Sequence, residues 1–423
     1  MGLAFGLLIA QAGIIFLMSI FTGKRILLGV SGSIAAYKAA DLASKLAQGA
    51  AQVTVILTAG AEKFISALTF QSVTGQRAYT DADLWAGEAH VLHVGLARGA
   101  DLFVIGPCTA HTMAKLAHGE ADNLLTITAL AAACPLLLAP AMDGGMWGHP
   151  ATQANLRTLQ ERGVLLAGPV EGHLASGMSG AGRMLEPAEL LGYVRLALGR
   201  EGKLAGRRVV VTAGGTQEPV DPVRVLTNRS SGKQGFALAQ AALDAGALVT
   251  LIATPTTSAL ALPVGARHIR VGTAREMLAA VLGEGLHADA LLMAAAVADF
   301  SVAEAAPNKL KKREGLPEIK LVLAPDVLAA VAGASAEGSG PKVVVGFAAE
   351  TRDLLENASE KLESKRLSFI AANDISTPDA GFGADTNRVT LLFADGRTEA
   401  LPLMSKAEVA EAIIEHVATL LEA

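Results

Sequence analysis

Short apolar runs alternate along the chain with longer stretches in which apolar residues recur every three or four positions. The first run covers residues 25–30, a helical pattern follows from 34 to about 47, and a second apolar run covers 52–57. Buried strands and amphipathic helices produce these two periodicities. The pattern therefore predicts a βαβ unit, with the small residues 31–33 in the turn between strand and helix.

The same alternation recurs along the rest of the chain. Further strands are expected at 100–105, 135–139, 208–212 and 248–253, and an apolar strand is expected to run through 294–300. Strands that alternate with helices favour doubly wound parallel sheets, whose ligands bind at the carboxyl ends of the strands. We expect an α/β protein with two doubly wound Rossmann-like domains.

A helix and a Gly/Lys/Arg-rich stretch between residues 186 and 207 mark the expected domain boundary. A chain of 423 residues is long for one core and suits two domains of ordinary size. The predicted domains cover 23–195 and 204–423.

The first 22 residues allow two interpretations. Residues 2–21 are uncharged and about as long as a membrane-spanning helix, but they lead directly into the first strand without a linker. Translation from Met18 would instead give an ordinary soluble start. We expect residues 1–17 to lie outside the fold, residues 1–22 to be a mis-assigned start or a disordered extension, and no membrane association.

Charge and cysteine content exclude some classes of protein. The net charge of −5 gives no general reason to expect nucleic acid as a partner. Cys108 and Cys134 are the only cysteines, so no disulfide framework exists and a reducing, cytoplasmic location fits. Both cysteines are expected to be packing residues.

Five motifs stand out in the first half: Val-Ser-Gly-Ser-Ile-Ala-Ala-Tyr-Lys (30–38), Pro-Cys-Thr-Ala (107–110), Ala-Asp-Asn-Leu (121–124), Pro-Ala-Met-Asp-Gly-Gly-Met-Trp (140–147) and Gly-Ala-Gly-Arg-Met (180–184). Together they resemble the flavoprotein family of cysteine decarboxylases, with phosphopantothenoylcysteine decarboxylase as the closest type. The resemblance implies a flavodoxin-like domain that binds FMN in a trimeric unit. The implied FMN contacts are Gly32, Ser33, Thr58, Thr109 and Ala110.

The turn at 31–33 supports this implication only weakly by itself. Backbone N–H groups at a helix N-terminus suit a phosphate, but a Ser/Gly turn is equally often a plain helix cap. The resemblance further implies that His93 is the base for oxidation of the substrate thiol, after which loss of CO2 is easy. An imidazole group can act as a general base near neutral pH.

Two positions depart from the decarboxylase pattern. Asp143 stands where the family has asparagine, and Ser176 stands where it has a cysteine that protonates the intermediate. An ionised aspartate repels a substrate carboxylate, by roughly 4 kcal/mol at 4 Å and an effective dielectric near 20. A serine hydroxyl is also a far poorer proton donor than a thiol. We treat Asp143 and Ser176 as the catalytic positions on which this half depends.

The second half has the strand and helix pattern of a Rossmann-like nucleotide-binding domain. It contains neither a P-loop nor the dinucleotide-binding fingerprint. Ser-Ser-Gly-Lys-Gln-Gly (230–235) precedes a helix and is a plausible anion cradle. The basic run at 309–313 is either a solvated loop or a mobile cover that neutralises phosphate charge.

Further motifs of the second half lie at 221–224, 227–235, 295–300, 309–312, 345–351, 372–375 and 381–387. Together they resemble phosphopantothenate–cysteine ligase of the bacterial, CTP-using type fused behind a decarboxylase. The resemblance implies that Asn228 contacts the substrate carboxylate and the acyl-cytidylate made from it, and that Lys309 acts from a flexible loop. The implied nucleotide contacts are Ala295, Ala296, Asp299, Lys309, Phe347 and Lys365, with Asp299 as a Mg²⁺ ligand.

Three functional hypotheses remain at this point. The leading one is a bifunctional enzyme that uses 4'-phosphopantothenate, L-cysteine, CTP, Mg²⁺ and FMN. It would be a homo-oligomer with a trimeric flavoprotein core, dimeric ligase domains and possible dodecameric assembly. The second makes the first half an FMN-binding oligomerisation or regulatory module. The third is a pair of NAD-dependent oxidoreductase domains.

Overall fold

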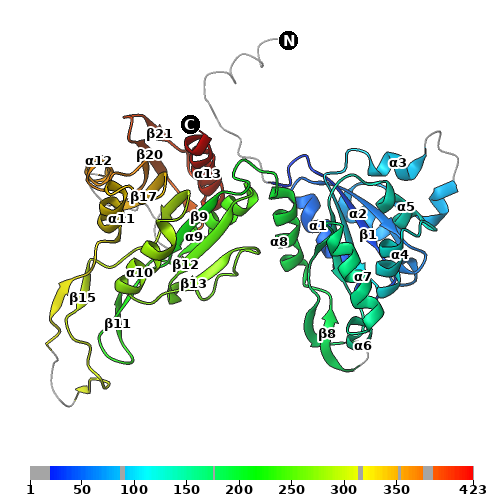
Figure 1. The fold of residues 1–423 in the computed structure, drawn as a ribbon, viewed down its shortest axis with the longest axis horizontal. Helices are drawn as coiled ribbons and strands as arrows, with labels where there is room; N and C mark the ends of the chain where they lie inside the picture. Colours follow the sequence, from blue (N-terminus) through cyan, green and yellow to red (C-terminus); the bar gives the residue numbers. More distant parts are fainter. Residues whose placement is uncertain are drawn as a thin grey trace, which may run out of the picture.

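The structure, a computed structural model, describes residues 20–85, 91–174, 177–312, 318–350, 354–374 and 384–422. Two α/β bodies lie side by side, and the chain passes from the first to the second after a helix that faces both (Figure 1). Within the described ranges, no helix is both long and apolar enough to cross a membrane.

The N-terminal body contains a six-stranded parallel sheet. Its strands are β1 (Arg25–Val30), β2 (Gln52–Leu57), β3 (Ala78–Thr80), β4 (Leu102–Cys108), β5 (Leu136–Pro140) and β6 (Leu165–Leu166). Their order is β3-β2-β1-β4-β5-β6. This confirms the doubly wound class, and the order is that of the Rossmann fold, whereas flavodoxin has the order 2-1-3-4-5.

Helices cover both faces of this sheet. One core cluster joins it to α1 (Ala36–Gln48), α2 (Ala67–Thr74) and α8 (Pro187–Gly199). The other joins it to α3 (Leu92–Ala97), α4 (Ala110–His118), α5 (Leu124–Ala131) and α7 (Pro150–Glu161). The short helix α6 (Gly144–Trp147) and the hairpin of β7 (Val170–His173) and β8 (Ser179–Arg183) pack together at one end.

Two helix starts differ from the sequence prediction. The first helix was expected from Ile34 but begins at Ala36, and Ile34 is exposed. The helix expected near Met113 begins at Ala110, because the Thr109 hydroxyl accepts a hydrogen bond from the Thr112 N–H and caps it.

The C-terminal body contains an eight-stranded sheet in the order β13-β12-β9-β14-β17-β18-β20-β21. The strands are β9 (Arg208–Ala213), β12 (Leu248–Ala253), β13 (Arg267–Arg270), β14 (Ala290–Met293), β17 (Val343–Glu350), β18 (Phe369–Asp374), β20 (Val389–Phe393) and β21 (Thr398–Ala400). The first six are parallel, and β20 and β21 add antiparallel pairs at the edge. The expected Rossmann-like second half is thus confirmed.

Two core clusters again define the faces of the sheet. One contains residues of α9 (Lys233–Asp244) and α13 (Lys406–Glu422). The other contains residues of α10 (Ala274–Gly285), α11 (Val327–Ala336) and α12 (Leu354–Ser364). This division decides from which face each side chain enters the site at the strand ends.

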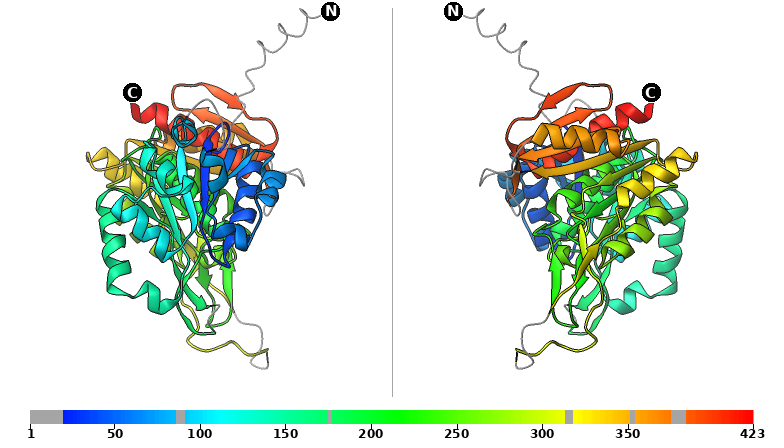
Figure 2. Two further views of the ribbon diagram at one scale, coloured as in Figure 1. Left: turned by 90° about the vertical axis from the view of Figure 1, so that its right-hand side faces the viewer. Right: turned by 90° about the vertical axis from the view of Figure 1, so that its left-hand side faces the viewer.

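Two short antiparallel ribbons project from the C-terminal body. One pairs β10 (Gln217–Pro219) with β11 (Val225–Thr227), and the other pairs β15 (Phe300–Val302) with β16 (Leu321–Leu323). Both extend in the same direction in perpendicular views (Figures 1 and 2).

Helix α8 packs against both bodies. Leu190 and Val194 belong to the N-terminal core, whereas Leu196 packs on the core that contains α9 and α13. The backbones approach closely, since a Cβ atom on Gly199 would lie 2.7 Å from the Asp244 carbonyl oxygen. The division into domains at 23–195 and 204–423 stays a prediction, and α8 belongs structurally to both sides of that boundary.

Candidate functional sites

The turn after β1 lies where the carboxyl ends of three strands meet. Ser31 Oγ donates to the Pro107 carbonyl oxygen at 2.7 Å and accepts from the Thr109 N–H at 3.1 Å, so it ties the end of β1 to the end of β4. A Cβ atom on Gly32 would lie 2.9 Å from the Gly60 carbonyl carbon. Only glycine therefore allows this approach between the turns that follow β1 and β2.

These strand ends present a group of backbone donors. Among the described residues, the N–H groups of Gly32, Ser33 and Ile34 have no acceptor within the protein. Ala110 opens α4, where the first N–H groups of a helix also lack intrahelical partners. Thr58 holds the third strand end, since its hydroxyl accepts from the Ala61 N–H. Such donors at a topological switch point fit the phosphate of a flavin mononucleotide.

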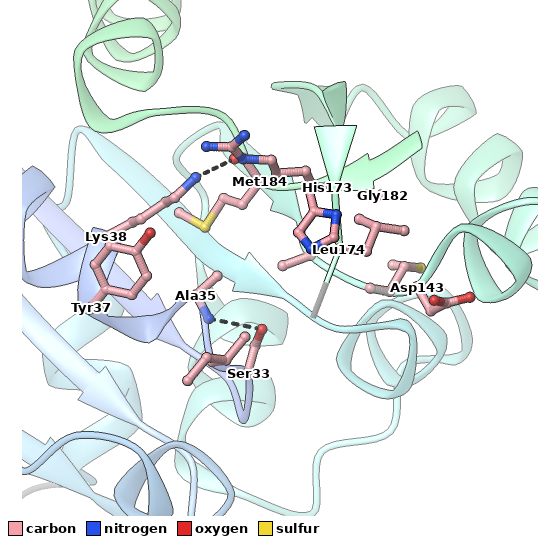
Figure 3. Close-up of a pocket in the computed structure, with 13 residues that line it drawn as sticks. Ser33, Ala35, Tyr37, Lys38, Asp143, His173, Leu174, Gly182 and Met184 are labelled. Carbon is pink, nitrogen blue, oxygen red and sulfur yellow. Dashed lines mark hydrogen bonds between the residues drawn. The ribbon is translucent and has the colours of Figure 1, made fainter. Parts of the chain in front are cut away.

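A cavity of about 290 Å³ adjoins this turn (Figure 3). One wall comes from Ser33, Tyr37 and Lys38, and the opposite wall comes from Asp143 and the hairpin residue His173. The motifs 140–147 and 180–184, far apart in sequence, meet here. The Met142 N–H donates to the Gly182 carbonyl oxygen at 3.0 Å, and Gly182 has a φ of +141°.

The cavity has a lysine, Lys38, at one end and a carboxylate, Asp143, at the other (Figure 3). Lys38 is buried, and its Nζ donates to the Met184 carbonyl oxygen and to the Glu186 carboxylate, at 2.8 and 2.9 Å. The hydrogen bond from Lys38, with the help of Arg183, lowers the pKa of Glu186. Asp143 lies away from this cluster and accepts from the Gly145 N–H at 2.9 Å, which caps α6.

Of the predicted catalytic residues, His93 does not line this cavity and Ser176 cannot be placed. His93 is half-buried on α3 and does not line it. Ser176 lies outside the described residues. Cys108 is buried in the core, as expected for a packing residue, and burial raises its pKa to about 12. Burial also raises the pKa of Cys134, which is only partly buried.

A second and larger cavity, of about 820 Å³, lies at the carboxyl ends of β14, β17 and β18. Its size is within the range of ligand and cofactor sites. Six predicted site residues line it: Asn228, Ala295, Ala296, Asp299, Phe347 and Lys365. Lys309 does not, because it lies exposed between β15 and β16.

The segment after β14 departs from the sequence prediction. A strand was expected through residue 300, but it ends at Met293 because the next residues are held by the end of β9 and the loop after it. The Ala295 N–H donates to Thr212 Oγ1, the Ala296 N–H to the Gly214 carbonyl oxygen, and the Ala298 N–H to Thr216 Oγ1, at 2.8–3.0 Å. Ala295 and Ala296 therefore lie in a turn that lines the cavity and do not belong to strand β14.

Asn228 faces this turned segment. Its amide nitrogen lies 3.4 Å from the carbonyl oxygens of Ala296 and Val297. Both hydrogen bonds are long, and the residue is exposed to the cavity. The amide can thus turn its N–H groups toward a bound oxygen without disturbing the fold.

Lysines enter the cavity from both faces of the sheet. From α12, Lys361 donates to the Phe347 carbonyl oxygen at 3.1 Å, and Lys365 pairs with Asp326 at 2.6 Å. Burial acts to raise the pKa of Asp326, but hydrogen bonds from Lys365 and the Ala329 N–H outweigh it, so this pKa is lowered. From the other face come Lys233 of α9 and Lys406 of α13.

Motif reasoning missed Lys361 and Lys406. Lys361 could have been found, because its i,i+4 spacing from Lys365 places both on one helix face. Lys406 carries no local signal, since it reaches the cavity only through the packing of α13 on α9.

The loop that carries Lys309 is anchored at its base. Asp221 is buried and accepts from the Leu310 N–H at 3.2 Å, and Arg224 donates to the Asp221 carboxylate and to the Leu310 carbonyl oxygen. Burial acts to raise the pKa of Asp221, but hydrogen bonds from Val223, Leu310 and Arg224 together lower it. The motif 221–224 thus fixes the residue next to Lys309.

A protein-built metal centre is absent from the part of the chain that the structure describes, where no three His, Cys, Asp or Glu residues cluster suitably. Asp299 is exposed at the cavity. A Mg²⁺ ion there would take most of its ligands from water and nucleotide phosphates, as is usual for this ion.

Two Rossmann-like bodies, one with a phosphate cradle and one with a lysine-lined cavity, define a two-site α/β enzyme. The "Flavoprotein" family model matches residues 20–198, and the "DNA/pantothenate metabolism flavoprotein C-terminal domain" model matches 204–421.

Curated relatives match nearly the whole chain. The coenzyme A biosynthesis bifunctional protein CoaBC of Bacillus subtilis (strain 168) is 42% identical over 400 residues, which cover 94% of this chain and 97% of that protein. The CoaBC protein of Mycobacterium tuberculosis (strain H37Rv) is 44% identical over 409 residues, with the same coverage. A crystal structure of a CoaBC C-terminal domain has a TM-score of 0.44 and 34% identity, covering 52% of this chain and 98% of that one.

The chain therefore belongs to the CoaBC family of bifunctional coenzyme A biosynthesis proteins. This confirms the predicted family and its pairing of a ligase with a flavoprotein decarboxylase. The alternative of two NAD-dependent oxidoreductase domains is set aside.

Proposed function

We propose that this chain ligates L-cysteine to 4'-phosphopantothenate with CTP and then decarboxylates the product to 4'-phosphopantetheine. The observation that carries the proposal is the 820 Å³ cavity, which has lysines at both sides and six motif residues in its walls. Two anionic substrates must bind there together, and a cavity of this size accommodates both.

The ligase reaction begins when the substrate carboxylate attacks the α-phosphorus of CTP and pyrophosphate leaves. The cysteine amine then displaces cytidine monophosphate from the mixed anhydride. Lys361 contacts the Phe347 carbonyl oxygen and Lys365 lines the same cavity, so this side suits the nucleotide, together with Ala295 and Ala296. Lysines placed there offset charge that develops on the phosphoryl oxygens.

Three further residues complete the proposed ligase site. Asn228 donates its amide N–H groups to the carboxylate that is activated. Lys309 acts from the ribbon loop, which must approach the cavity during turnover. Asp299 helps to hold Mg²⁺ together with the nucleotide phosphates.

The first half binds FMN in our proposal, with its phosphate at the N–H groups of Gly32, Ser33 and Ala110 and beside Thr58 and Thr109. Bound FMN would accept two electrons from the substrate thiol, which makes loss of CO2 easy, and would return them to the decarboxylated product to give the thiol. The cavity beside the cradle, with Lys38 and Asp143 at its ends, orients the acyl-cysteine substrate. His93 does not line this cavity within one chain, so its role as the base for the thiol requires that a neighbouring subunit of the proposed trimer brings it to the site. Ser176 stands at the position that returns a proton.

In the alternative, only the ligase works and the first half is an FMN-binding oligomerisation or regulatory module. Asp143 and Ser176, which replace the asparagine and cysteine of the family motifs, favour it. A single coupled assay separates the two, with pyrophosphate and CO2 measured independently from 4'-phosphopantothenate, cysteine and CTP. We expect both products. Normal pyrophosphate release without CO2 from added 4'-phosphopantothenoylcysteine would establish the alternative.

We further propose a cytoplasmic homo-oligomer that combines flavoprotein trimers with ligase dimers, up to a dodecamer. Exposed apolar side chains on the two ribbons support the dimer contact: Val223, Val225, Leu226, Phe300, Leu321, Val322 and Leu323. Such a concentration of exposed apolar residues is typical of a protein interface.

A further inference from the structure

The β7–β8 hairpin brings an imidazole, that of His173, to the cavity beside the phosphate cradle. His173 is the last residue of β7, where it pairs with Ser179 of β8, and its exposed side chain lines the cavity of about 290 Å³. The ring lies between Lys38 on one side and Asp143 on the other (Figure 3). It therefore faces the space that the acyl-cysteine substrate is proposed to fill.

The hairpin holds His173 at a defined place. Immediately after it, the Leu174 N–H donates to the Met178 carbonyl oxygen at 2.8 Å and closes the turn. The second strand is tied to the motif 140–147 by the hydrogen bond from the Met142 N–H to the Gly182 carbonyl oxygen, and α6 packs against it. A side chain on such a supported strand can keep the geometry that proton transfer needs.

The other charged or titratable groups of the cavity are Tyr37, Lys38, Asp143 and Arg183. Lys38 and Arg183 both donate to the Glu186 carboxylate. An ionised carboxylate at Asp143 has no proton to give, and a phenol such as that of Tyr37 is a far weaker acid than an imidazolium.

The His173 ring differs from these groups in its freedom. Within the ranges that the structure describes, no protein group forms a hydrogen bond or an ion pair with it. Both ring nitrogens are thus available to a ligand in the cavity. An imidazole is also the side chain best suited to exchange a proton near neutral pH.

Decarboxylation creates a need for such a group. Loss of CO2 from the oxidised substrate leaves an ene-thiolate, whose electron pair is shared between sulfur and the carbon that carried the carboxylate. That carbon must gain a proton before the saturated thiol can form. Ser176 offers only a hydroxyl, which is a poor proton donor, so the proton has to come from another residue.

We propose that His173 is the proton donor that completes the decarboxylase reaction. The inference rests on the proposed decarboxylase function and adds a residue to it. The imidazolium N–H bond breaks, and the C=C electron pair of the ene-thiolate forms a C–H bond at the carbon that has lost CO2. A sulfur electron pair then forms C=S, and this thioaldehyde takes back, as hydride, the two electrons removed in the first step. The imidazole regains its proton from water.

The test is a single turnover of 4'-phosphopantothenoylcysteine by the full-length, FMN-loaded protein without oxygen. In the wild type, the yellow flavin colour should bleach and then return as 4'-phosphopantetheine forms. We expect His173→Gln to bleach and release CO2 at nearly the wild-type rate, but to regain its colour about 100-fold more slowly. The ene-thiol, which has two hydrogens fewer than 4'-phosphopantetheine, should accumulate. The matched control is His118→Gln, at an exposed histidine that ends α4 outside the cavity.

A second measurement needs no turnover. Diethyl pyrocarbonate acylates accessible imidazoles, and bound 4'-phosphopantetheine should protect His173 while His118 stays reactive, as read by mass spectrometry of peptides. Equal slowing of bleaching and recovery in His173→Gln, recovery at the wild-type rate, or no protection of His173 would overturn the assignment. If the wild-type protein itself neither bleaches nor releases CO2, the proposed decarboxylation fails, which is a different result from bleaching that recovers without His173.

Discussion

Arg195 of α8 forms two hydrogen bonds with the carboxylate of Asp244 of α9, one from Nε at 3.1 Å and one from Nη2. The Arg195 guanidinium also lies 5.7 Å from the centre of the Phe21 ring. Phe21 belongs to the N-terminal core and Asp244 to the C-terminal body. This ion pair therefore links the two halves of the enzyme through one side chain.

The first prediction concerns the strength of this link. Arg195→Ala leaves Asp244, whose side chain is 10% exposed, with Gln240 as its remaining side-chain donor among the contacts described. We expect a loss of about 2 kcal/mol in the free energy of unfolding, because a mostly buried carboxylate loses its counter-charge. Thermal unfolding followed by calorimetry measures this. The matched change Lys203→Ala, at an exposed ion pair, should cost less than about 0.5 kcal/mol.

The second prediction concerns pH. Burial raises the pKa of Glu411 to about 7, the charge of Asp244 adds to the shift, and Arg195 opposes it. The folded protein thus binds more protons than the unfolded chain between pH 4.5 and 7, so this group costs stability as pH rises through that window. Glu411→Gln should stabilise the protein at pH 8 by about 1 kcal/mol, a value discounted for partial exposure, and have little effect at pH 4.

Chemical denaturation at pH 4 and pH 8 tests the Glu411 prediction. A gain of equal size at both pH values would show that packing, rather than loss of the charge, is responsible. Since Arg195 lowers this pKa, the gain should be larger in the Arg195→Ala background.

The sequence was sufficient to place several strands. The strands at 25–30, 52–57 and 248–253 were predicted to the residue, because strands buried on both faces are predominantly apolar runs bounded by small or polar residues. The end of β14 could not be predicted in this way. Its apolar run continues past Met293, and only hydrogen bonds to Thr212, Gly214 and Thr216, about eighty residues earlier, turn the chain out of the sheet.

In the candidate sites, too, some residues could be predicted from local sequence and others could not. Asn228, Phe347 and Lys365 were found because they lie in motifs. Lys406 was missed because an N-terminal helix lysine is usually solvent-exposed, and its place in the cavity depends on hydrogen bonds to Asn387 and Thr386. Tertiary packing, which no local pattern encodes, decides such positions.

A third prediction addresses the decarboxylase half. Asparagine caps a helix about as well as aspartate, so Asp143→Asn should keep the hydrogen bond from Gly145 and the fold of α6. The new amide can donate to the substrate carboxylate, which the aspartate repels. We expect kcat/KM for CO2 release from 4'-phosphopantothenoylcysteine to rise at least about tenfold. Unchanged or lower CO2 release, with an unchanged melting temperature, would show that Asp143 does not face that carboxylate.

A fourth prediction separates catalysis from stability in the ligase site. Asn228→Asp replaces an amide donor with a carboxylate that faces the carbonyl oxygens of Ala296 and Val297 and two anionic substrates. CTP-dependent pyrophosphate release should fall about 100-fold, whereas the melting temperature should hardly change because both lost hydrogen bonds are long and exposed.

Lys309→Gln should reduce the same pyrophosphate release about 100-fold, although Lys309 lies outside the cavity. The physical reason is that the ribbon loop must bring its positive charge to the phosphates during turnover. Lys320→Gln, an exposed lysine just before β16, is the matched control and should stay within a few-fold of wild type. Full activity of both Asn228→Asp and Lys309→Gln, with intact melting, would place the ligase chemistry elsewhere on the chain.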